Sequence, residues 1–293
     1  MNPLLAAWLC WAVVGLSPVV GHYAAPVIHP VLLVFLGTLL ACVSFVPYLT
    51  KKAQWEALLS KENRLSFLFI GTFGTAFSFS ILLWALHFTT PANAAILQQS
   101  ELIYSLLFAF LFLKEIPTRG QMGASLLILT GTVLILLKEQ YSARWTGDLM
   151  IIGSTWMLQA ASCVAKKLSE RVDHRIIAAA RNFYALPVLV VILLYVFLRG
   201  DLYFQPTLTT AGIIFYTGLL KYVLAMLLWY YAIHKLHLAK VTAIYLSYPI
   251  LSFVLSILLG LEKAHFYQFA GLALTLAGAY YLTHITQKEQ ENL

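Results

Sequence analysis

Charged side chains are scarce in this sequence, and their scarcity excludes a soluble globular protein. Lys, Arg, Asp and Glu make up only 11% of the 293 residues, whereas 61% are apolar. The mean hydropathy is +0.82. A soluble domain of this length would expose too much of that apolar content to water. The sequence therefore indicates an all-α polytopic membrane protein.

Cysteine is also rare, and the three thiols show neither paired nor metal-type spacing. Cys10, Cys42 and Cys163 each fall within an apolar segment, which is typical of small core residues. The sequence also lacks a metal-ligand cluster, a glycine-rich phosphate loop and a nucleophile with a recognisable base. We therefore expect no metal, no cofactor and no catalytic residue. The missing nucleotide motif further argues against an ATP-driven pump.

Basic residues are present, but their placement excludes nucleic acid as a partner. The pI is about 9.2, yet the lysines and arginines lie in short loops between apolar runs, and no nucleic-acid-binding module is recognisable. The N-terminal segment Met1–Val20 lacks a basic start and a clear small-residue cleavage site. We therefore interpret it as the first membrane helix and not as a signal peptide.

Ten apolar runs can be separated, and each is near or above the length needed to span a bilayer. They are Leu4–Val20, Val31–Leu49, Leu65–Leu86, Ala92–Leu113, Met122–Leu137, Leu149–Ala165, Ile176–Leu198, Ala211–Ile233, Val241–Leu261 and Phe266–Leu282. The connection between Thr50 and Arg64 is long enough for structure of its own, and its apolar residues predict a short helix lying in the membrane interface.

The distribution of basic residues predicts the orientation. With a cytoplasmic N-terminus, thirteen lysines and arginines lie in cytoplasmic loops and in the tail, and four lie outside: Lys138, Arg144, Arg199 and Lys263. The remaining two, Arg181 and Lys221, lie within spans. The sequence therefore predicts a multi-pass protein of the plasma membrane with both termini in the cytoplasm.

The two halves of the chain repeat each other. At a constant offset of 147, residues 85–131 match residues 232–278 at twelve of forty-seven positions, including His87/His234, Ser105/Ser252, Glu115/Glu262 and Gly131/Gly278. Each half has five spans, an odd number, so the second half must enter the membrane in the opposite sense. We predict ten transmembrane helices in two inverted five-helix repeats, residues 1–140 and 141–293, which is the plan of secondary transporters.

Each half ends in a glutamate followed by a glycine-spaced final helix: Glu115, Gly123 and Gly131, then Glu262, Gly271 and Gly278. This combination resembles the EamA-type drug/metabolite transporter superfamily over nearly the whole chain. The resemblance implies a ten-helix inner-membrane transporter of small metabolites, with helices one to four of each half around a central cavity and helices five and ten peripheral. The first-half counterpart of Arg181 is an apolar stretch around Leu36, whereas many relatives carry a basic residue in both halves.

Glu101 is the most conspicuous candidate for a functional residue. It lies about 14 Å along the Ala92–Leu113 run, near the middle of the bilayer, where a carboxylate is costly unless it faces a cavity or a partner. Gln98 lies one turn away on the same face. We interpret Glu101 as a substrate-binding residue and as the candidate for proton coupling. The alternative is a structural hydrogen bond between helices.

Lys221 lies about 15 Å inside its own span, at nearly the same depth as Glu101. Two opposite charges at one level predict a shared site, although a structural ion pair is the alternative. Arg181 is close to the cytoplasmic end of its span, so it could line a cavity or anchor the helix at the interface. Stacking and hydrogen-bonding groups for a substrate could come from Tyr222, Trp156, Gln159 and Tyr248.

These features predict a secondary transporter, not an enzyme, that moves small polar or amphipathic metabolites by alternating access through a central cavity. Amino acids or related zwitterions are favoured, because Glu101 would bind an ammonium group and Lys221 a carboxylate. The rival substrates are organic anions or phosphate esters, for which Lys221 and Arg181 would act together. The alternative of another class is an intramembrane enzyme or a regulatory binding protein. The expected partners are the small-molecule substrate and membrane lipid, and we expect a monomer or weak dimer.

Overall fold

The computed structural model describes residues 1–51, 54–85, 88, 97–136, 145–260 and 265–291, and its regular secondary structure is helical apart from one isolated β-bridge. The first half contains α1 (Pro3–Gly15), α2 (Ser17–Ala24), α3 (Pro30–Lys51), α4 (Trp55–Leu58), α5 (Arg64–Gly71), η1 (Thr72–Phe77), α6 (Ser78–Ala85), α8 (Ser100–Leu113) and α9 (Arg119–Leu136). The second half contains α10 (Trp145–Leu168), α11 (His174–Phe183), α12 (Leu186–Leu198), α13 (Leu208–Phe215), η2 (Tyr216–Ala225), α14 (Met226–Lys235), α15 (Leu238–Leu246), α16 (Pro249–Leu258) and α17 (Phe266–Glu291).

The helices agree with the ten predicted spans. Seven helical segments of the described chain are long and apolar enough to cross a membrane, and α8 and α9 are shorter apolar helices. The tenth span lies within α17. Residues 91–96, at the start of the predicted fourth span, and residues 140 and 141, at the predicted boundary between the repeats, lie outside the described residues. The protein is an all-α polytopic membrane protein with two inverted five-helix repeats.

Three of the spans are broken where a proline opens the second piece. Pro18, Pro187 and Pro249 each occupy the first turn of a new helix: α2, α12 and α16. Proline has no N–H group to lose at that position, so it fits there although it would disrupt a helix interior. Prolines within apolar runs can kink a membrane helix, and Pro18 and Pro249 each lie where a span divides into two helices. The loop before Arg64 forms the short helix α4, as predicted.

Two π-helical segments occupy equivalent positions in the two repeats. Gly74 lies within η1 and Lys221 within η2, and these two residues correspond at the offset of 147. A π-helical turn widens the backbone and often marks a functional position within an α-helix.

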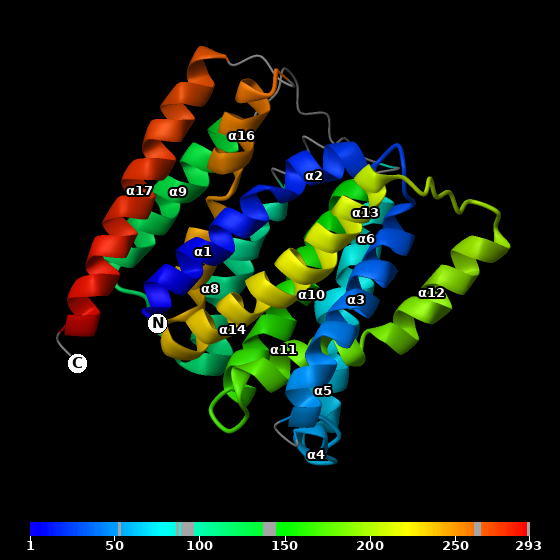
Figure 1. Cartoon of the computed structure of the whole chain (residues 1–293). Coiled ribbons are helices and arrows are strands. Elements are labelled where there is room, and N and C mark those ends of the chain that lie inside the picture. The colour runs from blue at the N-terminus through cyan, green and yellow to red at the C-terminus, as the bar shows by residue number, and fades with distance from the viewer. Residues whose placement is uncertain (52–53, 86–87, 89–96, 137–144, 261–264, 292–293) are drawn as a thin grey trace.

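The final helices of the two repeats lie side by side at one edge of the molecule (Figure 1). Glycines allow α9 and α17 to approach closely. A Cβ atom at Gly278 would lie 2.9 Å from the carbonyl oxygen of Ala124, a distance that real side chains do not tolerate. This is the small-residue packing that helices use in membranes.

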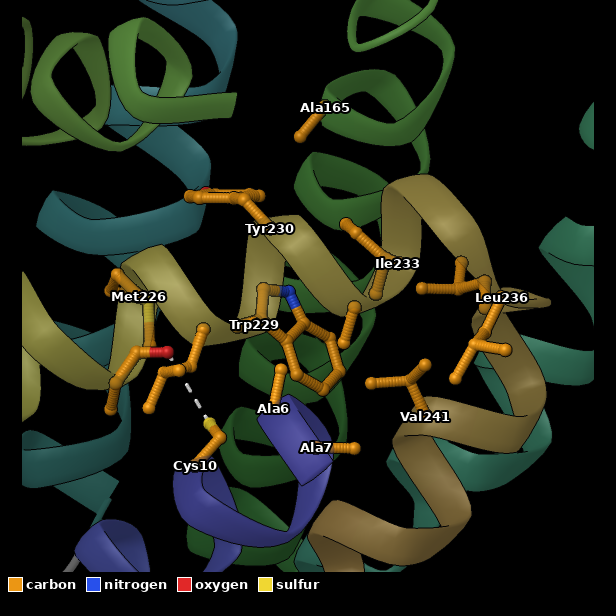
Figure 2. Close-up of a cluster of buried hydrophobic side chains, with 14 of the residues drawn as sticks. Ala6, Ala7, Cys10, Ala165, Met226, Trp229, Tyr230, Ile233, Leu236 and Val241 are labelled. Carbon is orange, nitrogen blue, oxygen red and sulfur yellow. Dashed lines mark hydrogen bonds between the residues drawn. The ribbon is translucent and has the colours of Figure 1, made fainter. Parts of the chain in front are cut away.

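The centre is a close-packed core between α1 and α14. The small side chains of Ala6 and Ala7 on α1 lie on the side of the Trp229 ring that faces α1, and Cys10 lies further along the same helix (Figure 2). The Cys10 thiol donates to the carbonyl of Ala225 at 3.4 Å. Tyr230, the next residue along α14, lies on the other side of the helix. The core therefore fixes α14 so that Tyr230 faces away from α1.

We expect both ends of the chain to face the cytoplasm, as the basic residues predict. In a variant without the three native cysteines, a cysteine at the exposed Asp201 should react with a membrane-impermeant maleimide added to intact cells. A cysteine at the exposed Arg171 should react only after the cells are opened. The opposite labelling pattern would invert the orientation.

Candidate functional site

Glu101 lies in the first turn of α8 and is almost completely buried, with 6% of its surface exposed. Its Oε2 atom accepts a hydrogen bond of 3.2 Å from Nε2 of Gln159 on α10. Next to it, the hydroxyl groups of Ser100 and Thr155 lie 2.8 Å apart and join the same two helices. Because α8 begins at Ser100, the Glu101 carboxyl group lies at the N-terminal, positive end of the α8 dipole. One residue from each repeat therefore forms this contact.

Arg181, on α11, is equally buried, with 6% of its surface exposed. Its guanidinium group donates to Thr75 Oγ1 at 2.7 Å, to the hydroxyl of Tyr230 at 3.2 Å and to the carbonyl oxygen of Gly74. Sequence reasoning left open whether Arg181 anchors the helix at the interface. In the structure it is buried and donates three internal hydrogen bonds, which are the contacts expected of a residue in the protein interior.

Gly74 makes room for this arrangement. A Cβ atom at Gly74 would lie 2.9 Å from the Cβ of Ala161 on α10 and 3.8 Å from the Cζ of Arg181. The π-helical turn η1 places the Gly74 carbonyl where the arginine reaches it. The glycine and the irregular turn together bring three spans to one point.

Lys221 lies in η2 and is half-buried. Its ammonium nitrogen is 5.5 Å from the centroid of the Phe79 ring, and the Cζ of Arg181 is 5.9 Å from the same centroid. Phe79 also stacks on Tyr222, with the ring centroids 5.9 Å apart. Among the described residues, Lys221 makes no hydrogen bond and no ion pair. Its ammonium group is therefore stabilised by cation–π attraction to Phe79.

Glu101 and Lys221 do not contact each other directly. No Lys or Arg nitrogen of the described chain lies within ion-pair distance of the Glu101 carboxyl group. The charge of Arg181 acts on both residues, attracting Glu101 and repelling Lys221. We call Glu101, Arg181 and Lys221 the charged cluster. That Glu101 and Lys221 serve one substrate remains a prediction.

Tyr248 connects the charged cluster to the symmetry of the fold. Tyr248 and Glu101 are equivalent residues of the two repeats, and the charge of Glu101 acts on the Tyr248 phenol. Tyr248 is therefore the residue of the second repeat that corresponds in position to Glu101.

The span breaks at this point in both repeats. α15 ends at Leu246 and α16 begins at Pro249, whereas α8 begins at Ser100 after a turn at Gln99. Gln99 is 2% exposed, and neither amide atom has a hydrogen-bond partner in the described chain. Oε1 of Gln159 is also unpartnered. Polar groups that are buried without partners are costly, and they are a common feature of sites that receive a ligand or water.

The remaining candidates are placed differently. Tyr222 is buried beside Phe79, and Gln98 is half-buried one turn before Glu101. Trp156 is 42% exposed and packs edge-on against Phe108, with the ring centroids 6.2 Å apart, and Phe108 is not part of the charged cluster. Sequence reasoning missed Thr75, Phe79 and Tyr230. Only the position of Thr75 next to Gly74, the repeat partner of Lys221, could have indicated one of them.

Comparisons with known proteins agree on the kind of protein. The model of the EamA-like transporter family matches residues 2–137 and again residues 145–283. An uncharacterized transporter of Archaeoglobus fulgidus is 24% identical over 81% of this chain and 83% of its own. The uncharacterized transporter YetK of Bacillus subtilis is 26% identical over 96% of this chain and 86% of its own. A crystal structure with a TM-score of 0.80 covers 98% of both chains at 16% identity and therefore shows the fold alone.

Proposed function

The chain belongs to the EamA-like transporter family, and from that membership we propose that it is a secondary transporter of small polar or amphipathic metabolites that works by alternating access. It is a multi-pass membrane protein, and we assign it no catalytic role. The observation that carries the proposal is the charged cluster, which draws residues from both repeats into the interior of the membrane domain. Charges at that depth are expensive and usually mark a substrate or ion pathway.

The charged cluster supports a site that changes with the packing of the repeats. Glu101 belongs to the first repeat and its partner Gln159 to the second, and Arg181 of the second repeat is held by Thr75 and Gly74 of the first. A relative movement of the repeats would alter these contacts. Substrate sites of inverted-repeat transporters lie in this place, at the interface between the repeats.

Contacts between the repeats at the external end support one closed state. The backbone of Ile28 pairs with Phe204 in an isolated antiparallel bridge. The Tyr203 hydroxyl donates to the carbonyl of Ala25 at 2.8 Å, and the Gln205 N–H donates to Val27 at 2.8 Å. These are mainly backbone contacts between two loops, which open without leaving a buried charge behind.

A second set of contacts joins the repeats at the cytoplasmic end. Oε1 of Glu115 lies 2.5 Å from Nζ of Lys166, and Oε2 of Glu115 accepts a hydrogen bond of 2.8 Å from the Leu238 N–H. Lys166 also donates to the carbonyl of Leu236. One carboxylate thus holds α10 and the N-terminus of α15, where the helix dipole favours a negative charge. We refer to Glu115, Lys166 and Leu238 as the cytoplasmic contact set.

Weakening the cytoplasmic contact set should favour the state open to the cytoplasm. We expect Glu115→Gln to increase labelling of a cysteine at Ser105, in the inner half of its span, and to decrease labelling of its repeat partner Ser252→Cys. The matched control is Glu62→Gln, because the Glu62–Arg171 pair at the same end is 73% and 59% exposed and exposed pairs contribute little. If Glu115→Gln changes the labelling of neither cysteine, this contact set does not hold the cytoplasmic end closed.

Counterflow in proteoliposomes tests the proposed function. Metabolites that raise the melting temperature of the purified protein are selected first, because a ligand of the folded state stabilises it by mass action. The vesicles are then loaded with an unlabelled metabolite, and uptake of its labelled form is followed. We expect exchange without chemical change. Conversion of the metabolite, or binding without exchange, would instead support an intramembrane enzyme or a regulatory binding protein.

The charges of the cluster distinguish two classes of substrate. A zwitterion such as an amino acid could use Lys221 for its carboxylate and Glu101 for its ammonium group. An organic anion would instead use the positive side of the cluster, where Arg181 and Lys221 share the Phe79 ring. The proximity of these two cations is the observation that favours the second candidate.

A further inference from the structure

We infer that the transported solute is a net anion whose acidic group binds the ammonium of Lys221 beside the face of Phe79. This inference rests on the proposed transport function and specifies the substrate class of the same site. It assigns different tasks to the two cations: Arg181 holds the repeats together, and Lys221 binds the ligand.

The contacts of the two cations support this division. Arg181 uses its Nε, Nη1 and Nη2 atoms in hydrogen bonds to Thr75, Tyr230 and Gly74. The ammonium of Lys221 lies beside the Phe79 ring, and among the described residues none of its three N–H groups has an acceptor. An ammonium group that lies deep in a membrane domain without an acceptor can donate hydrogen bonds to an acidic group of a bound ligand.

The balance of charge shows which kind of acceptor fits. The buried charges of the described chain outside the cluster, Asp148 and Lys240, lie in the first turns of α10 and α15, at helix ends. The charged cluster therefore contains two cations and one carboxylate, a net charge of +1. A monoanion neutralises this charge. A zwitterion leaves it uncompensated and adds an ammonium group close to Arg181, which repels it.

The surroundings of Phe79 suit an acid with an apolar part. Phe79 and Tyr222 offer stacked aromatic faces. Lys221 can bind a carboxylate, and the two rings can bind a small apolar body beside it.

Three probes with one carbon skeleton and different charges test the inference. They are 3-phenylpropanoate, which is a monoanion, phenylalanine, which is a zwitterion, and 2-phenylethylamine, which is a cation. Thermal stability of the purified full chain is measured with each probe at millimolar concentration. We expect 3-phenylpropanoate to give the largest increase in melting temperature. In Lys221→Met its Kd should rise about 10- to 100-fold, as expected for loss of a charge-assisted hydrogen bond.

Variants separate binding from folding. Lys221→Arg keeps the charge and should retain much of the stabilisation, whereas Lys235→Met, an exposed lysine on α14, should behave like the unmodified protein. A larger shift with phenylalanine or the amine, no shift with the acid, or a shift that survives Lys221→Met would overturn the inference. Counterflow of the probes keeps the two proposals distinct. Exchange of the zwitterion alone rejects anion selectivity but keeps transport, and exchange of none of the bound probes rejects transport.

Discussion

Replacing Arg181 with methionine is expected to destabilise the protein more than any other single change in the charged cluster. The substitution leaves Thr75, Tyr230 and the Gly74 carbonyl without their common partner. It also removes the positive charge that acts on the buried Glu101. Removing one member of a buried charged network typically costs about 3–5 kcal/mol. The measurement is the free energy of unfolding in detergent, together with the yield of monodisperse protein.

Two further variants define the cause of the loss. Arg181→Lys keeps the charge but cannot form the forked set of hydrogen bonds, so we expect an intermediate stability. Arg175→Met, which replaces an exposed arginine on the same helix, should change stability little. If Arg181→Met were as stable as the unmodified protein, Arg181 would not be the residue that joins the repeats.

Replacing Glu101 with glutamine is expected to abolish uphill accumulation while counterflow continues. Glutamine can still accept the hydrogen bond from Gln159, so the contact between α8 and α10 is retained. It cannot take up or release a proton, so a pH gradient can no longer drive transport. Exchange of internal for external solute needs no net proton movement and should persist. The two activities are measured in the same proteoliposomes, with and without an imposed pH gradient.

The control for this variant is Glu56→Gln, because Glu56 is exposed on α4. It should accumulate solute as the unmodified protein does. Uphill accumulation by Glu101→Gln at the normal rate would show that the coupling proton binds elsewhere, or that another ion drives transport.

Much of the fold follows from the sequence because a bilayer imposes strong rules on composition. Apolar runs of sufficient length predict the ten spans, and an odd number of spans per repeat predicts their inversion. Proline chemistry predicts the breaks at Pro18 and Pro249, where the local rule and the structure agree. The π-helical segments η1 and η2 could not be predicted, because an apolar run gives the length of a span but not its local hydrogen-bond pattern.

The site could be predicted only in part, because a sequence gives the depth of a residue in the membrane but not which neighbour it faces. Glu101 and Lys221 have nearly equal depths, and from depth alone a direct pair is a reasonable expectation. The structure places Arg181 in contact with the first repeat and Lys221 on the Phe79 ring. The depth of Arg181 in its span could not decide whether it lines a cavity or anchors the helix at the interface. Its reach across to Gly74 depends on a turn that the sequence does not reveal.

The central claim is that Glu101 and Lys221 serve one substrate site. The most direct test is counterflow by the double variant Glu101→Gln/Lys221→Met, normalised to the amount of folded protein. The double change removes one charge of each sign, so the cluster keeps its net charge of +1 on Arg181, and we expect the variant to fold. Our account predicts that this folded variant exchanges no solute, because the acidic group of the ligand has lost the ammonium of Lys221. Counterflow at the rate of the unmodified protein would show that the two residues are structural and would contradict the account.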